Sequence, residues 1–297
     1  MGIVLGANQY GKAETRVVRL YRDGPRHEIR DLNVSTALRG DFTAAHVGGD
    51  QSAVLPTDTQ KNTAFAYAKA HGISSPEDYA LAVAGRLLEA APAATGARVA
   101  VDEHAWDRIE VDGAGHDHAF VRRGQEVRTA VVGRTREAVA VESGFRDLVL
   151  LKSTGSEFKG FLRDEYTTLA EADDRILATS LDATWRHRDD PDDWDASYAA
   201  VRALVTATFA TTYSRALQET LHAMGRAVLE AHDDLVEISF RAPNKHHFLV
   251  DLTPFGLDNP GEVFHAADRP YGLIEGTIVR DGVAPAPEAW TDVPTFV

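Results

Sequence analysis

The chain contains no cysteine. Without a thiol it can form no disulfide, and it can hold no thiolate nucleophile, iron–sulfur cluster or zinc site built from cysteine. A protein without disulfides suits a reducing compartment, so we expect a cytoplasmic location.

Long apolar runs and basic clusters are also missing. No apolar stretch approaches the ~20 residues needed to cross a bilayer, and residues 1–9 lack the parts of a signal peptide, so we expect no membrane association. The chain has 31 Lys and Arg against 45 Asp and Glu, a net charge of −14. This charge repels phosphate backbones, and no basic cluster offsets it, so nucleic acid is not an expected partner.

Of the 297 residues, 44% are hydrophobic, enough for one large domain or two of ordinary size. In the first half, β-branched segments predict strands at 3–5, 16–21, 27–34, 98–101 and 126–132. An Asp-Gly-Pro turn at 23–25 separates two of these strands, which indicates a hairpin.

Two helices are predicted between these strands. The first covers 57–69, with Thr57 or Asp58 near its N-cap. The second begins at Ser75, a capping residue followed by proline, and apolar residues then recur every four positions at Tyr79, Val83 and Leu87.

The second half repeats this order. Strands are predicted at 147–152, 175–179 continuing through 183–185, 235–240, 247–252 and 273–279. A long helical region covers about 195–230. The sequence therefore predicts an α+β protein with two tandem domains, residues 1–140 and 141–297, each an antiparallel sheet with paired helices on one face.

Six segments, in order along nearly the whole chain, resemble the uricase family. The longest is LVLLKSTGSEFKGFLRDEYTTLAEADDR (148–175), and the others are NQYGKAE (8–14), LRGDF (38–42), PTDTQKNT (56–63), PNKHHF (243–248) and ADRPYG (267–272). The resemblance implies two T-fold domains per subunit and a homotetramer around a central tunnel. It also implies oxidation of urate by O₂ to 5-hydroxyisourate and hydrogen peroxide, with no metal and no organic cofactor.

The resemblance further implies which residues bind urate. Arg175 and Gln218 would clamp one edge of the planar substrate, because a guanidinium fork and an amide can form a two-point contact with adjacent carbonyl and ring-nitrogen groups. Phe158 would stack on the purine face. Leu217 and Asp58 would each offer a backbone N–H. Taken singly, each of these residue types is more often structural than functional.

The oxidising half of the site would consist of Lys12, Thr57, Asn244 and His246. Urate must lose protons to donate electrons, so Lys12 beside the Thr57 hydroxyl would relay protons, and His246 would extend that relay. Asn244 and Thr57 would hold O₂ or peroxide and then water above the ring. The resemblance divides the site between two subunits. One contributes Lys12, Thr57 and Asp58, and its neighbour contributes Phe158, Arg175, Leu217, Gln218, Asn244 and His246.

Two alternatives stay open: a zinc-dependent T-fold enzyme acting on a pterin or purine, and a non-catalytic purine-binding homologue. The histidine pairs His116/His118 and His246/His247 suggest a metal. However, adjacent strand residues point to opposite faces, and no third ligand accompanies the first pair, so we expect structural or proton-relay histidines. No Gly-x-Gly-x-x-Gly follows a strand, which argues against a dinucleotide. The last residues, 294–297, lack a peroxisomal Ser-Lys-Leu signal, which favours a bacterial-type cytoplasmic enzyme.

Overall fold

The computed structural model describes residues 2–267, 269–284 and 286. Its strands are β1 (Tyr10–Tyr21), β2 (Glu28–Gly40), β3 (Ala94–Glu103), β4 (Trp106–Val111), β5 (Ala114–Arg122), β6 (Val127–Thr135), β7 (Val139–Lys152), β8 (Leu177–His187), β9 (Leu235–Pro243), β10 (His246–Leu249), β11 (Phe264–Ala267) and β12 (Leu273–Val279). Its helices are α1 (Thr43–Gly48), α2 (Thr57–Ala70), α3 (Pro76–Ala90), α4 (Trp194–Thr211), α5 (Leu217–Ala231) and the 3₁₀ turn η1 (Thr253–Phe255).

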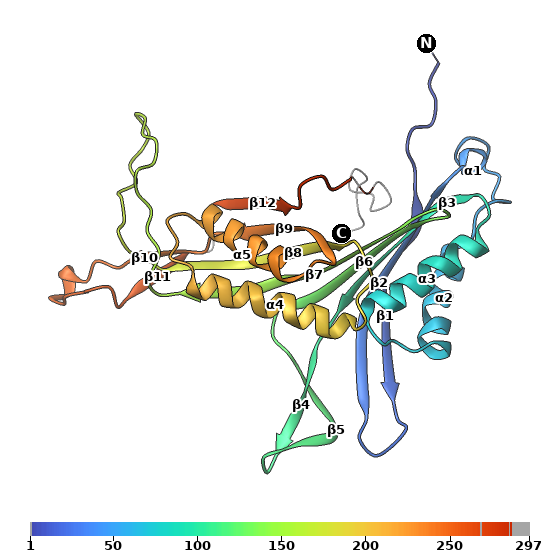
Figure 1. The fold of residues 1–297 in the computed structure, drawn as a ribbon, viewed down its shortest axis with the longest axis horizontal. Coiled ribbons are helices and arrows are strands. Elements are labelled where there is room, and N and C mark those ends of the chain that lie inside the picture. The colour runs from blue at the N-terminus through green and yellow to red at the C-terminus, as the bar shows by residue number, and fades with distance from the viewer. Residues whose placement is uncertain (1, 268, 285, 287–297) are drawn as a thin grey trace.

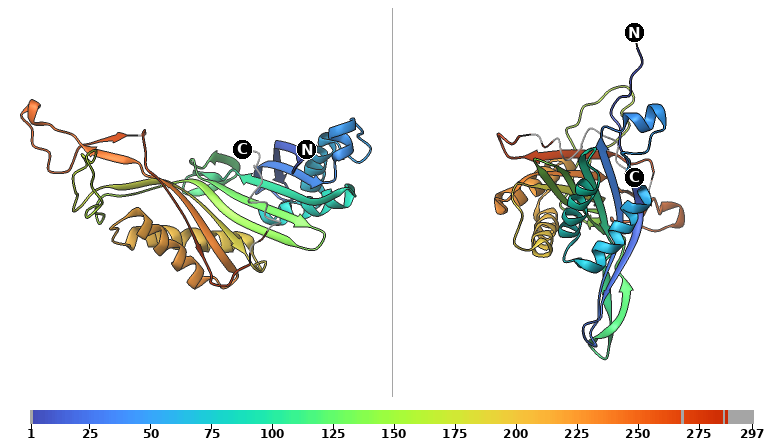
Figure 2. Two further views of the ribbon diagram at one scale, coloured as in Figure 1. Left: turned by 90° about the horizontal axis from the view of Figure 1, so that it is seen from above. Right: turned by 90° about the vertical axis from the view of Figure 1, so that its right-hand side faces the viewer.

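The strands of both halves form one long antiparallel sheet of eight strands (Figure 2). Their order is β1-β2-β3-β6-β7-β8-β9-β12, while β4–β5 and β10–β11 form separate two-stranded ribbons. No linker interrupts the sheet at the halfway point, because β6 pairs directly with β7. The predicted division at 140/141 falls near the start of β7 and stays a prediction.

Helices α2–α5 lie on one face of this sheet, in two pairs along its length (Figure 1). Val141 and Phe145 share a face of β7, since they are four positions apart in the strand. Val141 packs into the core under α2 and α3, whereas Phe145 packs into the core under α4 and α5. This confirms the predicted α+β fold with antiparallel strands and paired helices on one face. No helix in the described part of the chain is long and apolar enough to span a membrane.

Local signals place the helices of the first half correctly. Ser75 accepts a hydrogen bond from the Asp78 backbone N–H at 3.0 Å, so α3 begins where the capping residue predicts. Its predicted apolar face is fully buried at Tyr79, Val83 and Leu87. α2 begins at Thr57 as expected, but its N-cap is Pro56, and neither Thr57 nor Asp58 is the capping residue.

Three predicted segments differ in the structure. Residues 3–5 are exposed and irregular rather than a strand, because no strand among the described residues pairs with them. The helical region 195–230 is two helices, since 212–216 is largely extended between α4 and α5. β10 ends at Leu249 instead of continuing to 252. The η1 turn then begins, where the Asp251 side chain accepts a hydrogen bond from the Thr253 N–H. The β4–β5 ribbon was not predicted.

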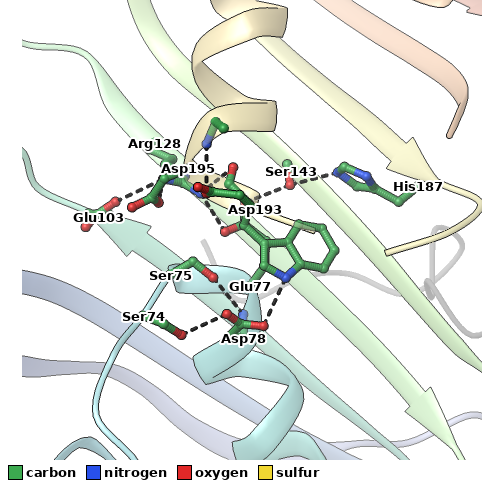
Figure 3. Close-up of polar contacts among 12 residues, drawn as sticks. Ser74, Ser75, Glu77, Asp78, Glu103, Arg128, Ser143, His187, Asp193 and Asp195 are labelled. Carbon is green, nitrogen blue, oxygen red and sulfur yellow. Dashed lines mark hydrogen bonds and ion pairs between the residues drawn. The ribbon is translucent and has the colours of Figure 1, made fainter. Parts of the chain in front are cut away.

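Polar side chains join the two halves between their apolar cores (Figure 3). Arg128 of β6 is 8% exposed and pairs with Glu77 of α3 at 2.7 Å and with Asp195 of α4 at 2.5 Å. Ser143 of β7 donates to the Glu77 carboxylate at 2.7 Å and lies 3.0 Å from Nε2 of His187. Burial lowers the pKa of His187 to about 4, so its ring is neutral near pH 7.

Candidate functional site

The structure places the predicted site residues in two groups at opposite ends of the sheet (Figure 1). The N-terminal group, at β1 and the start of α2, consists of Lys12, Thr57 and Asp58. The C-terminal group, in the loops around α5, β9 and β10, consists of Phe158, Arg175, Leu217, Gln218, Asn244 and His246. Within one chain, the residues of each group therefore lie in one region. The two groups, however, are far from each other.

In the C-terminal group, Arg175 lies over Phe158. The guanidinium carbon is 5.0 Å from the ring centroid, a cation–π contact. Phe158 is fixed by two backbone hydrogen bonds with Ala172, at 2.8 and 3.0 Å. Burial lowers the pKa of Arg175, and its Nε has no hydrogen-bond partner in the described part of the chain. A half-buried cation with an unpartnered donor is suited to an anionic or carbonyl-rich ligand.

The start of α5 adds donors to this group. Leu217 is 3% exposed and is the first residue of α5, and the exposed Gln218 follows it. The N-cap, Ala216, has no side-chain oxygen, so the first backbone N–H groups of the helix lack a side-chain acceptor from the cap. Backbone N–H groups in this position favour a negatively charged ligand.

Asn244 and His246 follow β9. The Asn244 N–H donates to the Gly272 carbonyl at 2.8 Å, and Asn244 forms an isolated bridge with Thr179 of β8. His246 is half-buried, and burial lowers its pKa. The charges of Arg175 and His247 lower it further. The neutral imidazole is therefore the favoured form near pH 7.

In the N-terminal group, a polar contact holds α2 against the strand that carries Lys12. Thr36 of β2 lies 3.4 Å from the Lys12 backbone nitrogen and donates to the side chain of Gln60 in α2 at 2.8 Å. Gln60 is fully buried. A Cβ at Gly11 would lie 1.7 Å from the Thr36 carbonyl oxygen, so only glycine fits before Lys12.

Lys12 is close enough to Asp58 for its charge to act on the Asp58 carboxylate. A hydrogen bond from Lys61 and its positive charge are the main causes that lower the pKa of Asp58, and Lys12 contributes as well. Thr57 is half-buried at the first position of α2, and its hydroxyl does not cap the helix. A lysine near a helix start that carries a threonine is suited to proton transfer.

The remaining histidines were also candidates for metal ligands. In the described residues, no group of three or more His, Cys, Asp or Glu side chains could hold a metal ion. His116 and His118 pack edge to face, 4.5 Å apart, and the His118 N–H donates to the His116 ring. A cavity of about 790 Å³ lies between the β4–β5 ribbon and α4, and none of the predicted site residues line it.

Sequence reasoning did not single out Asp174. Its carboxylate accepts hydrogen bonds from Thr154 Oγ1 at 2.6 Å and from the Gly155 N–H at 2.9 Å, and it directly precedes Arg175. The residue lies within the long segment that resembles the uricases, but only the folded loop shows what it holds.

Comparison with known proteins shows which family this chain resembles. A model of the uricase family matches residues 8–133 and 141–275. The chain is 52% identical to a uricase of Arthrobacter globiformis over 294 residues, covering 99% of this chain and 96% of that protein. It is 37% identical to a uricase of Danio rerio, covering 91% and 93% of the two chains.

Solved structures of uricases also resemble this chain. The crystal structure of the Arthrobacter globiformis uricase has a TM-score of 0.93 at 52% identity and covers 98% of this chain and 100% of that chain. A uricase from Bacillus fastidious has a TM-score of 0.79 at 28% identity and covers 92% of this chain and 93% of that chain.

Proposed function

The chain belongs to the uricase family and is a urate oxidase, and we propose that it oxidises urate with O₂ without a bound metal or organic cofactor. Urate would give two electrons to O₂, which takes up two protons and leaves as hydrogen peroxide. Water would supply the hydroxyl oxygen of 5-hydroxyisourate. The observation that carries this proposal is the Arg175–Phe158 contact beside the start of α5, which offers stacking and directed donors to a flat, anionic purine.

The C-terminal group would bind and orient urate. Arg175 and Gln218 would contact one edge of the ring, and the Leu217 N–H would donate to it. Phe158 would fix the plane of the ring by stacking. Because these groups hold the substrate but take no proton from it, their main contribution is to binding.

The N-terminal group would act on protons and oxygen. Lys12 and Thr57 would accept a proton from urate and later activate water, and His246 would extend this relay from the other group. Asn244 and Thr57 would hold O₂, peroxide or water by hydrogen bonds, and the Asp58 N–H would donate at the α2 start. A neutral His246 can both accept and donate a proton, as a relay requires.

We also propose that the active protein is a homotetramer with each site shared between two subunits. The two residue groups lie at opposite ends of one chain, so a complete site needs a second copy (Figure 1). Large apolar side chains are exposed near the C-terminal group: Leu162 at 95%, Tyr166 at 81% and Phe255 at 74%. Exposed apolar side chains of this size favour a subunit interface. Sedimentation analysis would measure the oligomeric state.

Two experiments test the proposal as a whole. Purified protein dialysed against a chelator should consume urate, followed by its ultraviolet absorbance, and produce one peroxide per urate. Activity that disappears on dialysis and returns with zinc would contradict the cofactor-free mechanism. The cytoplasmic location is also a proposal, supported by the absence of cysteine, and cell fractionation would test it.

A further inference from the structure

The residues proposed to bind urate come from three chain segments that meet at Ser156. The Arg175 N–H donates to the Ser156 carbonyl at 2.7 Å. Ser156 also forms a parallel bridge with Ser214, in which the Ser214 N–H donates to the Gly155 carbonyl at 3.0 Å and the Glu157 N–H donates to the Ser214 carbonyl at 2.9 Å. The positions of Phe158, Arg175 and the start of α5 are therefore linked through this bridge.

The side chain of Ser214 continues the link into α5. Ser214 and Thr220 are both 0% exposed. The Thr220 hydroxyl donates to Ser214 Oγ at 2.8 Å, and Ser214 Oγ donates to the Ala216 carbonyl at 3.1 Å. Ala216 is the N-cap and offers no side-chain bond of its own, so these two hydroxyls connect the first turn of α5 to the bridge.

On the side away from Ser214, Asp174 holds the strand of the bridge that contains Ser156. Its carboxylate accepts from Thr154 Oγ1 and from the N–H groups of Gly155 and Ser156, at 2.6, 2.9 and 3.3 Å. The hydrogen bond from Thr154 has the largest effect, and together these bonds hold the pKa of Asp174 below its usual range. The Asp174 carboxylate is therefore ionised near pH 7. The loop before Phe158 is thus fixed relative to Arg175, and Ser214 is the point at which α5 joins it.

We propose that Ser214 and Thr220 are positioning residues for urate, which set the place of Leu217 and Gln218 relative to Arg175 and Phe158. This rests on the proposed function of the same site. A two-point contact with a rigid ring tolerates displacements of only about 0.5 Å. Apolar side chains could fill the same buried space without needing hydrogen-bond partners, whereas two hydroxyls fix a direction as well as a distance.

The test compares Ser214→Ala and Thr220→Val with a matched control, Thr206→Val. Within the described part of the chain, the Thr206 hydroxyl of α4 bonds only to carbonyls of its own helix, those of Arg202 and Ala203. Urate affinity is measured without oxygen, so that no turnover occurs, and KM and kcat are measured in air. Ser214→Ala and Thr220→Val should each raise Kd and KM about ten-fold, because each removes a buried directional bond.

The kinetic pattern separates positioning from general damage. In both variants kcat should stay within about two-fold, since Lys12, Thr57 and His246 are unchanged. Thr220→Ser keeps the donor and should bind urate like the wild type, and Thr206→Val should too. Unchanged affinity in both Ser214→Ala and Thr220→Val would overturn the proposal, as would an equal loss in Thr206→Val or a fall in kcat alone.

A measurement without ligand keeps the two proposals separate. Amide hydrogen exchange over residues 213–220 should be faster in Ser214→Ala than in Thr206→Val, whether or not urate binds. Failure of the wild type to bind urate would contradict the proposed function, and unchanged exchange would contradict the positioning role. If Ser214→Ala does not fold, urate affinity and amide exchange are both measured on Thr220→Val, because valine keeps the branched shape of threonine.

Discussion

The guanidinium of Arg175 lies 5.0 Å from the centroid of the Phe158 ring, and no carboxylate in the described part of the chain pairs with it. Arg128, by contrast, is neutralised by Glu77 and Asp195. Arg175 thus combines a fixed position with an unneutralised charge, which is what a ligand-binding cation requires.

Replacing this arginine should mainly weaken binding. Arg175→Gln removes a charge-assisted contact and should raise the urate Kd, measured without oxygen, by about ten- to a hundred-fold. Arg163→Gln is the matched control, because Arg163 stacks on Phe161 at the same 5.0 Å and has no proposed role in binding. Unchanged affinity in Arg175→Gln would mean that the substrate contact is assigned to the wrong residue.

Replacing the relay lysine should mainly slow the chemistry. Lys12→Met removes the group proposed to move protons and should lower kcat by at least about a hundred-fold, while anaerobic urate affinity changes little. Lys69→Met, in the last turn of α2, is the control for loss of one positive charge. A Lys12→Met protein with wild-type turnover would remove this residue from the mechanism.

Mixing these two variants tests the shared site. If Lys12 and Arg175 act across an interface, co-refolding equal amounts of Lys12→Met and Arg175→Gln chains yields hybrid pairs in which one site carries both defects and the other is intact. Random mixing should then restore about a quarter of the wild-type activity. If labelled subunits show that hybrids formed and the mixture is no more active than its better parent, both residues act within one chain.

Acid stability should depend on His187. Its pKa is lowered to about 4, so the folded state resists protonation, and the stability from the neutral ring is present above pH 6.5 and lost as pH falls from 6.5 through about 4. The groups facing it are Ser143, Asp234, His232 and Trp194. His187→Gln should lose less stability over this range, measured as the urea midpoint at each pH. If the urea midpoints of the two proteins fall in parallel as the pH is lowered, His187 does not control the loss of stability in acid.

The ion pair between the halves should matter more for stability than exposed pairs do. Arg128→Met leaves Glu77 buried without its cation and should lower the free energy of unfolding by about 3–5 kcal/mol. Arg146→Met breaks a more exposed pair with Asp102 and should cost at most about 1 kcal/mol. Adding Glu77→Gln to Arg128→Met should recover part of the loss, and a double variant less stable than the single one would contradict this account.

The sequence by itself determined the features that depend on neighbouring residues. The Ser75 cap and the buried spacing of Tyr79, Val83 and Leu87 fixed α3, and the turn at 23–25 fixed the β1–β2 hairpin. These signals are local, since caps, turns and apolar periodicity act within a few residues. The family resemblance likewise followed from the order of short segments.

Only the tertiary structure decided how distant segments meet. The break between α4 and α5 lies where Ser214 pairs with the loop at Gly155, and no local signal marks that pairing. The separation of Arg175 from Lys12 follows from the order of strands along one continuous sheet. Such contacts join residues far apart in the chain, so their geometry is set by packing of the whole sheet rather than by the sequence around any one of them.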